Sequence, residues 1–253
     1  MIISDRLCFI HLPKTGGAFV RKFLTENVPK ARLYKGSHWH YPIGELKDPG
    51  NKQSIIGIVR NPLSWYVSFF YDNRRMTPIT QKAAKKAGKD PKPTDLMDYF
   101  DPEKSEDFVV FLNNIFEEIE TGNPPRFSYN TIDLDYEIMK KYDIGILTMI
   151  YMYMYFPEYD QLLEQDIDIF EMHDDLFGLD YVLNQDTLNT DLVNLLNNLY
   201  PDITGFEIQE KYSNVNVTKR EHWSNYYTED LIERVLHKDR MIFEKYNFAQ
   251  INN

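Results

Sequence analysis

Residues 6–24 read RLCFIHLPKTGGAFVRKFL, and this stretch decides which fold we expect. The side chains of Arg6–His11 alternate between bulky apolar and less apolar types, which predicts a strand. A turn follows at Pro13–Gly17, with the sequence PKTGG. After the turn, apolar residues recur at helical spacing: Phe19, Val20, Phe23 and Leu24. A strand, a glycine turn and a helix in this order predict an α/β protein.

A glycine turn that leads into a helix can hold an anion. Glycines let the backbone approach the ligand, and the unpaired N–H groups of the first helical turn point at it. Gly16 and Gly17 would allow that approach, while Thr15 adds a hydroxyl donor and Lys14 adds a positive charge. This is not a Walker A loop, because the lysine precedes the glycines. An ordinary strand-to-helix turn with a surface lysine is the alternative.

A second buried strand is predicted at Ser54–Arg60, because a continuous apolar run is typical of a parallel strand covered on both faces. Pro62 then suits the first turn of a helix, where its missing N–H is not needed. Arg60 would lie at the carboxyl end of the strand, where α/β sheets bind ligands. Arg60 and Ser68 could together grip a phosphate. Arg60 could equally pair with a buried carboxylate.

The rest of the chain is predicted to be largely helical, with apolar residues at helical spacing in four segments: 105–120, 144–156, 187–201 and 226–248. Thr228 is the expected N-cap of the last one. Short strands are expected at Arg32–Tyr34 and Ile167–Phe170. The basic stretch Lys82–Pro93 is interpreted as a solvated loop, or else as a flap over an anionic ligand. No repeat or Gly/Ser-rich linker divides the sequence, so we expect one domain over residues 1–253.

Composition narrows the class of protein. The chain has 253 residues, 43% of them hydrophobic and 15% aromatic, as in a globular protein with an aromatic-rich core. The net charge of -11 argues against non-specific nucleic-acid binding. Cys8 is the single cysteine, which excludes an internal disulfide and favours a buried structural thiol. No signal peptide or membrane span is predicted, because the apolar run Ile144–Phe156 is too short, and we expect a cytoplasmic protein.

The two glycine- and arginine-bearing segments together resemble a known family. FIHLPKTGGAF looks like the 5′-phosphosulfate-binding loop of the sulfotransferases that use 3′-phosphoadenosine 5′-phosphosulfate (PAPS). VRNPLSWYVSFFY looks like their 3′-phosphate-binding segment. The C-terminal NVNVTKREHWSNYYTEDLIERV is similar to the ending of the heparan sulfate 2-O-sulfotransferase type. The chain departs from the family at Ala18, where a Thr or Ser is common, and at Trp65, where many relatives have an Arg.

The resemblance implies a P-loop-like three-layer fold with a central parallel β-sheet flanked by helices. It also implies an O-sulfotransferase that takes PAPS as co-substrate, needs no metal and acts on a carbohydrate or small alcohol. The loop that binds the cofactor would be Pro13, Lys14, Thr15, Gly16, Gly17 and Ala18.

The resemblance assigns roles to further residues. Lys14 would stabilise the leaving group, and Arg60 and Ser68 would hold the 3′-phosphate. Lys219 and Arg220 are candidates to close over that phosphate, although they could also be a solvated pair. The position of His38 matches the base of the family, and His40 is the other candidate because an imidazole suits proton abstraction at neutral pH.

Two rival functions stay open at this point. A P-loop-type phosphotransferase would use ATP and magnesium, and an inactive protein would bind a nucleotide or glycan without turnover. Neither the acceptor nor the oligomeric state follows from the sequence.

Overall fold

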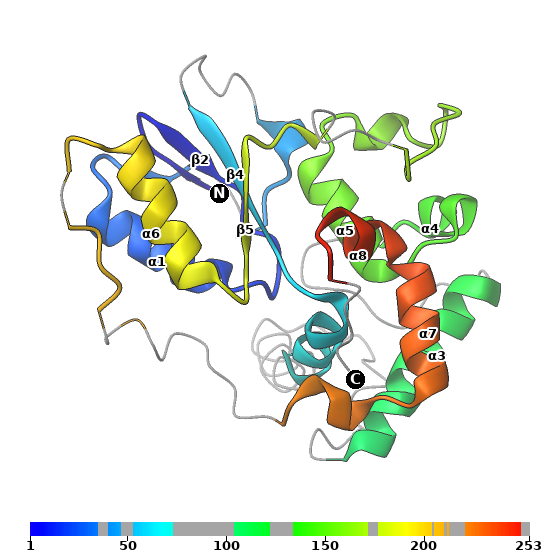
Figure 1. Cartoon of the computed structure of the whole chain (residues 1–253). Helices are drawn as coiled ribbons and strands as arrows, with labels where there is room; N and C mark the ends of the chain where they lie inside the picture. The colour runs from blue at the N-terminus through cyan, green and yellow to red at the C-terminus, as the bar shows by residue number, and fades with distance from the viewer. Residues whose placement is uncertain are drawn as a thin grey trace, which may run out of the picture. The chain divides into compact units, whose positions relative to one another are not determined.

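The computed structural model describes residues 1–34, 40–46, 53–72, 104–121, 134–171, 177–203, 205–209, 212 and 221–248 (Figure 1). The chain forms two compact units, each built from two separate stretches. The first unit comprises Met1–Arg60 and Ile150–Arg220, and the second comprises Asn61–Met149 and Glu221–Asn253. The single domain expected over residues 1–253 stays a prediction.

The first unit contains a five-stranded sheet in the order β3-β1-β2-β4-β5. The strand bounds are β1 Ile2–Ile3, β2 Leu7–Phe9, β3 Arg32–Leu33, β4 Ser54–Val59 and β5 Tyr181–Asn184. Strands β2, β4 and β5 are parallel, whereas β1 is antiparallel to both β2 and β3. The α/β class is therefore confirmed. The sheet itself is mixed, with a parallel core and an antiparallel edge, and not parallel throughout as predicted.

Two strand expectations need correction. The strand expected at Ile167–Phe170 is wrong, because the Asp168 carboxylate accepts the Phe170 N–H at 2.9 Å and closes a turn. The fifth strand is β5 instead, which the sequence analysis missed. Tyr181, its first residue, is exposed at the edge of the sheet, so the strand lacks the continuous apolar run of a buried one.

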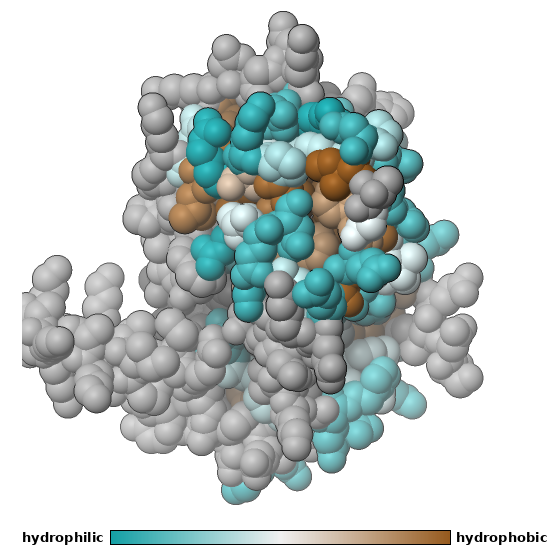
Figure 2. Space-filling view, turned by 90° about the vertical axis from the view of Figure 1, so that its left-hand side faces the viewer, coloured by the Kyte–Doolittle hydropathy of each residue, from teal (hydrophilic) through white to brown (hydrophobic). Residues whose placement is uncertain are grey.

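Helices α1 (Gly17–Asn27) and α6 (Leu188–Leu199) belong to the first unit, as do the short 3-10 turns Ile43–Glu45 and Tyr159–Gln161. The apolar face predicted for α1 is buried. Seen from the side of α1 and α6, hydrophilic residues cover much of the described surface, with hydrophobic residues between them (Figure 2). Cys8 is buried in β2, and burial raises the pKa of its thiol to about 12, as expected of a structural cysteine.

The second unit is helical in its described part. Its elements are a helix over residues 62–72, α3 Ser105–Thr121, α4 Tyr136–Tyr142, the 3-10 turn Trp223–Tyr226, α7 Glu229–Lys238 and α8 Arg240–Lys245. Helix α5 (Ile146–Tyr155) begins in this unit and ends in the first. The core is aromatic, with six fully buried rings: Trp65, Tyr66, Phe69, Phe70, Phe108 and Phe116. None of the described helices is both long and apolar enough to cross a bilayer.

The C-terminal segment forms two helices and not the single one predicted. Thr228 is the N-cap of α7, as expected, since its side chain accepts the Leu231 N–H. Helix α7 ends at Lys238, and α8 starts at Arg240. Asp239 lies between them with its carboxylate bound by Tyr66 and Thr148. These bonds fix Asp239 where the two helices meet.

Candidate anion-binding site

The turn between β2 and α1 has an alternating backbone conformation. Lys14 and Gly16 have positive φ angles of 61° and 92°, whereas Thr15 and Gly17 do not. Such alternation brings successive N–H groups to one side of the backbone, and the resulting concavity binds anions. A left-handed conformation costs a lysine about 1–2 kcal/mol. Strain of this kind tends to persist where a residue is held for function.

Both glycines of the turn are required by their surroundings. A Cβ on Gly16 would lie 2.8 Å from Leu188 Cδ2, at the start of α6, and the positive φ angle adds strain. A Cβ on Gly17 would lie 1.9 Å from the ring of His11. The backbone of the turn is therefore packed between α6 and His11, and no other residue type fits at these two positions without a shift of the neighbours.

Thr15 stabilises the turn from inside. Its side chain is fully buried, and its hydroxyl donates to the Leu12 carbonyl at 2.8 Å. In this structure the hydroxyl proton is thus used within the turn, and only the backbone of Thr15 is left to face an anion. Pro13 is buried beside it, and Ala18 is half-buried in the first turn of α1.

Strands β2 and β4 part at their carboxyl ends. The Ile10 N–H still donates to the Ile56 carbonyl at 2.9 Å. Two residues further along β4, the N–H and the carbonyl of Ile58 face the same side as those of Ile56. Both bond to the hydroxyl of Tyr155, at 2.8 and 2.9 Å. A side chain from α5 therefore replaces β2 as the partner of β4 at this end of the sheet.

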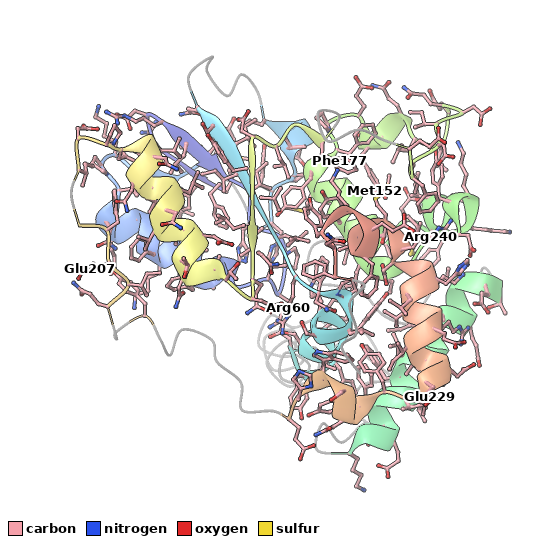
Figure 3. The ribbon with its side chains drawn as sticks, in the orientation of Figure 1. Arg60, Met152, Phe177, Glu207, Glu229 and Arg240 are labelled. Carbon is pink, nitrogen blue, oxygen red and sulfur yellow. The ribbon has the colours of Figure 1, made fainter. Side chains whose placement is uncertain are left out.

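Arg60 joins the two segments that the sequence analysis singled out. It follows β4 directly and lies at the end of that strand (Figure 3). Its side chain is buried, and Nη1 donates to the Lys14 carbonyl at 2.9 Å. The structure thus brings the arginine against the glycine turn, although 46 residues separate them in sequence.

Two histidines pack beside the turn. His11 is buried against Gly17, and the centroids of the His11 and His40 rings are 4.6 Å apart. The His40 Nδ1 lies 3.0 Å from the His11 carbonyl oxygen. A carbonyl can only accept, so Nδ1 carries the proton and the neutral ring has its lone pair on Nε2. Half-buried His40 is therefore in the tautomer that a base acting through Nε2 needs.

The surroundings of His11 are electropositive. Burial lowers the pKa of His11 well below its usual range, and the positive charges of Arg21 and Lys14 lower it further. Helix α1 has no acidic residue in its first turn and no side-chain cap. The positive charges of Arg21 and Lys14 beside the turn, in a chain with a net charge of -11, would favour an anionic ligand at this place.

The structure does not test the positions of the other predicted site residues relative to the turn. His38, Lys219 and Arg220 lie outside the described residues. Ser68 is buried in the helix over residues 62–72 and belongs to the second unit, so its role with Arg60 stays a prediction.

From the sequence, Tyr155 received no role, and His11 was expected only to pack at the end of the strand, where it is indeed buried. The contact between Tyr155 and Ile58 spans 97 residues, and no local pattern reveals it. A histidine at the end of a buried strand, next to the turn, was the available signal for His11.

Within the described ranges, no group of three or more His, Cys, Asp or Glu side chains could hold a metal ion. The chain matches no protein-family model, no curated protein and no solved structure.

Proposed function

We propose that this chain is a sulfotransferase that moves the sulfuryl group of PAPS to a hydroxyl of a carbohydrate or small alcohol. The observation that carries the proposal is the 2.9 Å hydrogen bond from Arg60 to the Lys14 carbonyl, which joins the two cofactor-binding segments of the resemblance. The proposal includes a P-loop-like fold. The β2–turn–α1 unit and the parallel strands β2, β4 and β5 support it.

The turn would hold the 5′-phosphosulfate. Successive N–H groups of Lys14–Gly17 and the start of α1 supply donors without any side chain. The Lys14 ammonium would face the oxygen that bridges phosphorus and sulfur. Negative charge grows on this oxygen as the sulfuryl group leaves, and a fixed positive charge stabilises it most in the transition state.

Arg60 would have two tasks. One of its five N–H donors holds the Lys14 carbonyl and so keeps the turn in its strained conformation. The planar guanidinium also suits a phosphate, and we assign the 3′-phosphate to it. Ser68, Lys219 and Arg220 are the further residues proposed around that phosphate.

The reaction needs a base for the acceptor hydroxyl. His40 is the supported choice among the described residues, because its bond to the His11 carbonyl leaves the lone pair on Nε2. Such an orienting bond on the second ring nitrogen is a usual feature of working histidines. His38 is the other candidate base.

The proposed transfer needs no oxidant or reductant. The acceptor oxygen forms a bond to sulfur while the bond from sulfur to the bridging oxygen breaks. The acceptor proton passes to the histidine, and the electron pair leaves with adenosine 3′,5′-bisphosphate. Alignment of the acceptor, the sulfur and the leaving oxygen supplies much of the acceleration.

Transfer of radioactive sulfur from labelled PAPS tests the proposal directly. We expect label in a panel of simple sugars or alcohols in the presence of EDTA. His40→Ala should lower the rate about 100-fold while the affinity for adenosine 3′,5′-bisphosphate stays within twofold. If label transfer fails for every acceptor while phosphate from labelled ATP is transferred with magnesium, the chain is a phosphotransferase and the proposal is wrong.

A further inference from the structure

A third strand of the parallel core also ends beside the glycine turn. Gln185 follows β5, and its N–H donates to the Val59 carbonyl at 2.9 Å, one residue before Arg60. The Cγ atom of Gln185 lies 3.9 Å from the position that a Cβ on Gly16 would take. Gln185 therefore lies against the turn at the carboxyl ends of the strands, where α/β sheets bind their ligands.

The side chain of Gln185 is not used to hold its own loop. It is half-buried, and in the part of the chain that the structure describes its carboxamide makes no hydrogen bond. Neighbouring side chains behave differently. Asn184 Oδ1 accepts the Asp186 N–H at 3.0 Å, and the Thr187 hydroxyl donates to the Asp191 carboxylate at the start of α6.

The geometry points to Gln185 as a ligand-contacting residue of the anion site, and this inference rests on the proposed function. Its carboxamide N–H would donate to an oxygen of the 5′-phosphate or of the sulfuryl group held by the turn. A carboxamide offers two donors and carries no charge. It can therefore select for the position of the anion without adding to the positive charge that Lys14 and Arg60 already supply.

Calorimetric titration of the full chain with adenosine 3′,5′-bisphosphate and, separately, with inorganic pyrophosphate tests the assignment. Gln185→Glu replaces the donor by a carboxylate of the same shape, and we expect it to weaken both ligands at least tenfold. Gln185→Ala removes one hydrogen bond and should weaken them about threefold. Gln209→Glu, the same chemical change at an exposed position of the first unit, should change either affinity less than twofold.

A second readout separates ligand contact from a structural role. Without ligand, Gln185→Glu should unfold at a higher temperature than the natural chain, because the new carboxylate takes the place of the anion among the positive charges. A structural glutamine would give a lower melting temperature.

The assignment is wrong if Gln185→Glu does not weaken ligand binding. It is also wrong if Gln185→Glu and Gln209→Glu weaken binding equally. If the natural chain binds pyrophosphate but not the nucleotide, and Gln185→Glu weakens pyrophosphate, then the assignment stands while the proposed function fails. If it binds neither, both are wrong.

Discussion

Helices α1 and α5 both begin after a glycine and have no acidic residue in the first turn, yet they satisfy their N-termini differently. At α5, the Thr148 N–H donates to the buried Asp239 carboxylate at 2.8 Å. Gly145 makes room for it, since a Cβ there would lie 2.7 Å from Asp239 Oδ2. At α1, the preceding turn carries Lys14, and the N-cap residue, Gly16, has no side chain with which to cap the helix.

We infer from this difference where an external anion would bind. The partial positive charge of a helix N-terminus favours an anion, and the protein supplies its own at α5. At α1 the protein instead places a further positive charge, that of Lys14, beside the partial positive charge of the helix N-terminus. We infer that the anion of α1 comes from outside as the phosphosulfate of the cofactor.

The largest effect is expected from Lys14→Gly, which removes the charge from the open N-terminus. Sulfuryl transfer should fall about 1000-fold, because the charge on the leaving oxygen is no longer stabilised. Lys30→Gly is the matched control. Lys30 is also a lysine of the first unit with a positive φ angle, of 58°, and its side chain is exposed. Initial rates for Lys14→Gly within tenfold of those for Lys30→Gly would contradict the role given to Lys14.

Removing the internal anion should instead damage the fold. Asp239→Ala leaves the Tyr66 hydroxyl and the N–H and hydroxyl of Thr148 without their acceptor. We expect urea denaturation to show a free energy of unfolding lower by about 3–5 kcal/mol. Asp239→Asn keeps the shape and an acceptor oxygen and should lose less than half of that. A loss below 1 kcal/mol for Asp239→Ala would mean that α5 does not need its anion.

The internal anion also predicts a pH dependence. Burial raises the pKa of Asp239 from 3.8 to about 6, so the folded state keeps a proton that the unfolded state releases between these values. The contribution of Asp239 to stability is therefore complete below pH 4 and falls as the pH rises to 6, by up to about 3 kcal/mol. The difference in unfolding free energy between the natural chain and Asp239→Asn should decrease over this interval. A difference that is flat or increases with pH would contradict the raised pKa.

The smallest effect concerns strain in the turn. Lys14→Gly should raise the free energy of unfolding by about 0.5–1 kcal/mol, because glycine adopts a positive φ angle freely. Lys30→Gly should gain a similar amount, since its ion pair with Asp5 is exposed and contributes little. If both variants gain stability but only Lys14→Gly loses sulfuryl transfer, then the strained conformation serves function at Lys14 and not at Lys30. If Lys14→Gly is less stable than the natural chain, then the positive φ angle of Lys14 does not strain the turn.

The sequence predicted the elements around the site because their signals are local. The periodicity of Phe19, Val20, Phe23 and Leu24 located α1, and the apolar run Ser54–Val59 located β4. The sequence could not reveal contacts between residues that lie far apart along the chain. The hydroxyl of Tyr155 bonds to Ile58 of β4, 97 residues away, in place of β2. The contact of Gly16 with Leu188 depends on how the sheet brings α6 to the turn. The break between α7 and α8 was missed because Asp239 is held by Tyr66, 173 residues away in sequence.

Calorimetric titration with adenosine 3′,5′-bisphosphate in EDTA tests the open N-terminus of α1 most directly. We expect saturable binding of one nucleotide per chain, which Lys30→Gly should retain and Lys14→Gly should lose. No binding to the natural chain, or equal binding to both lysine variants, would contradict it.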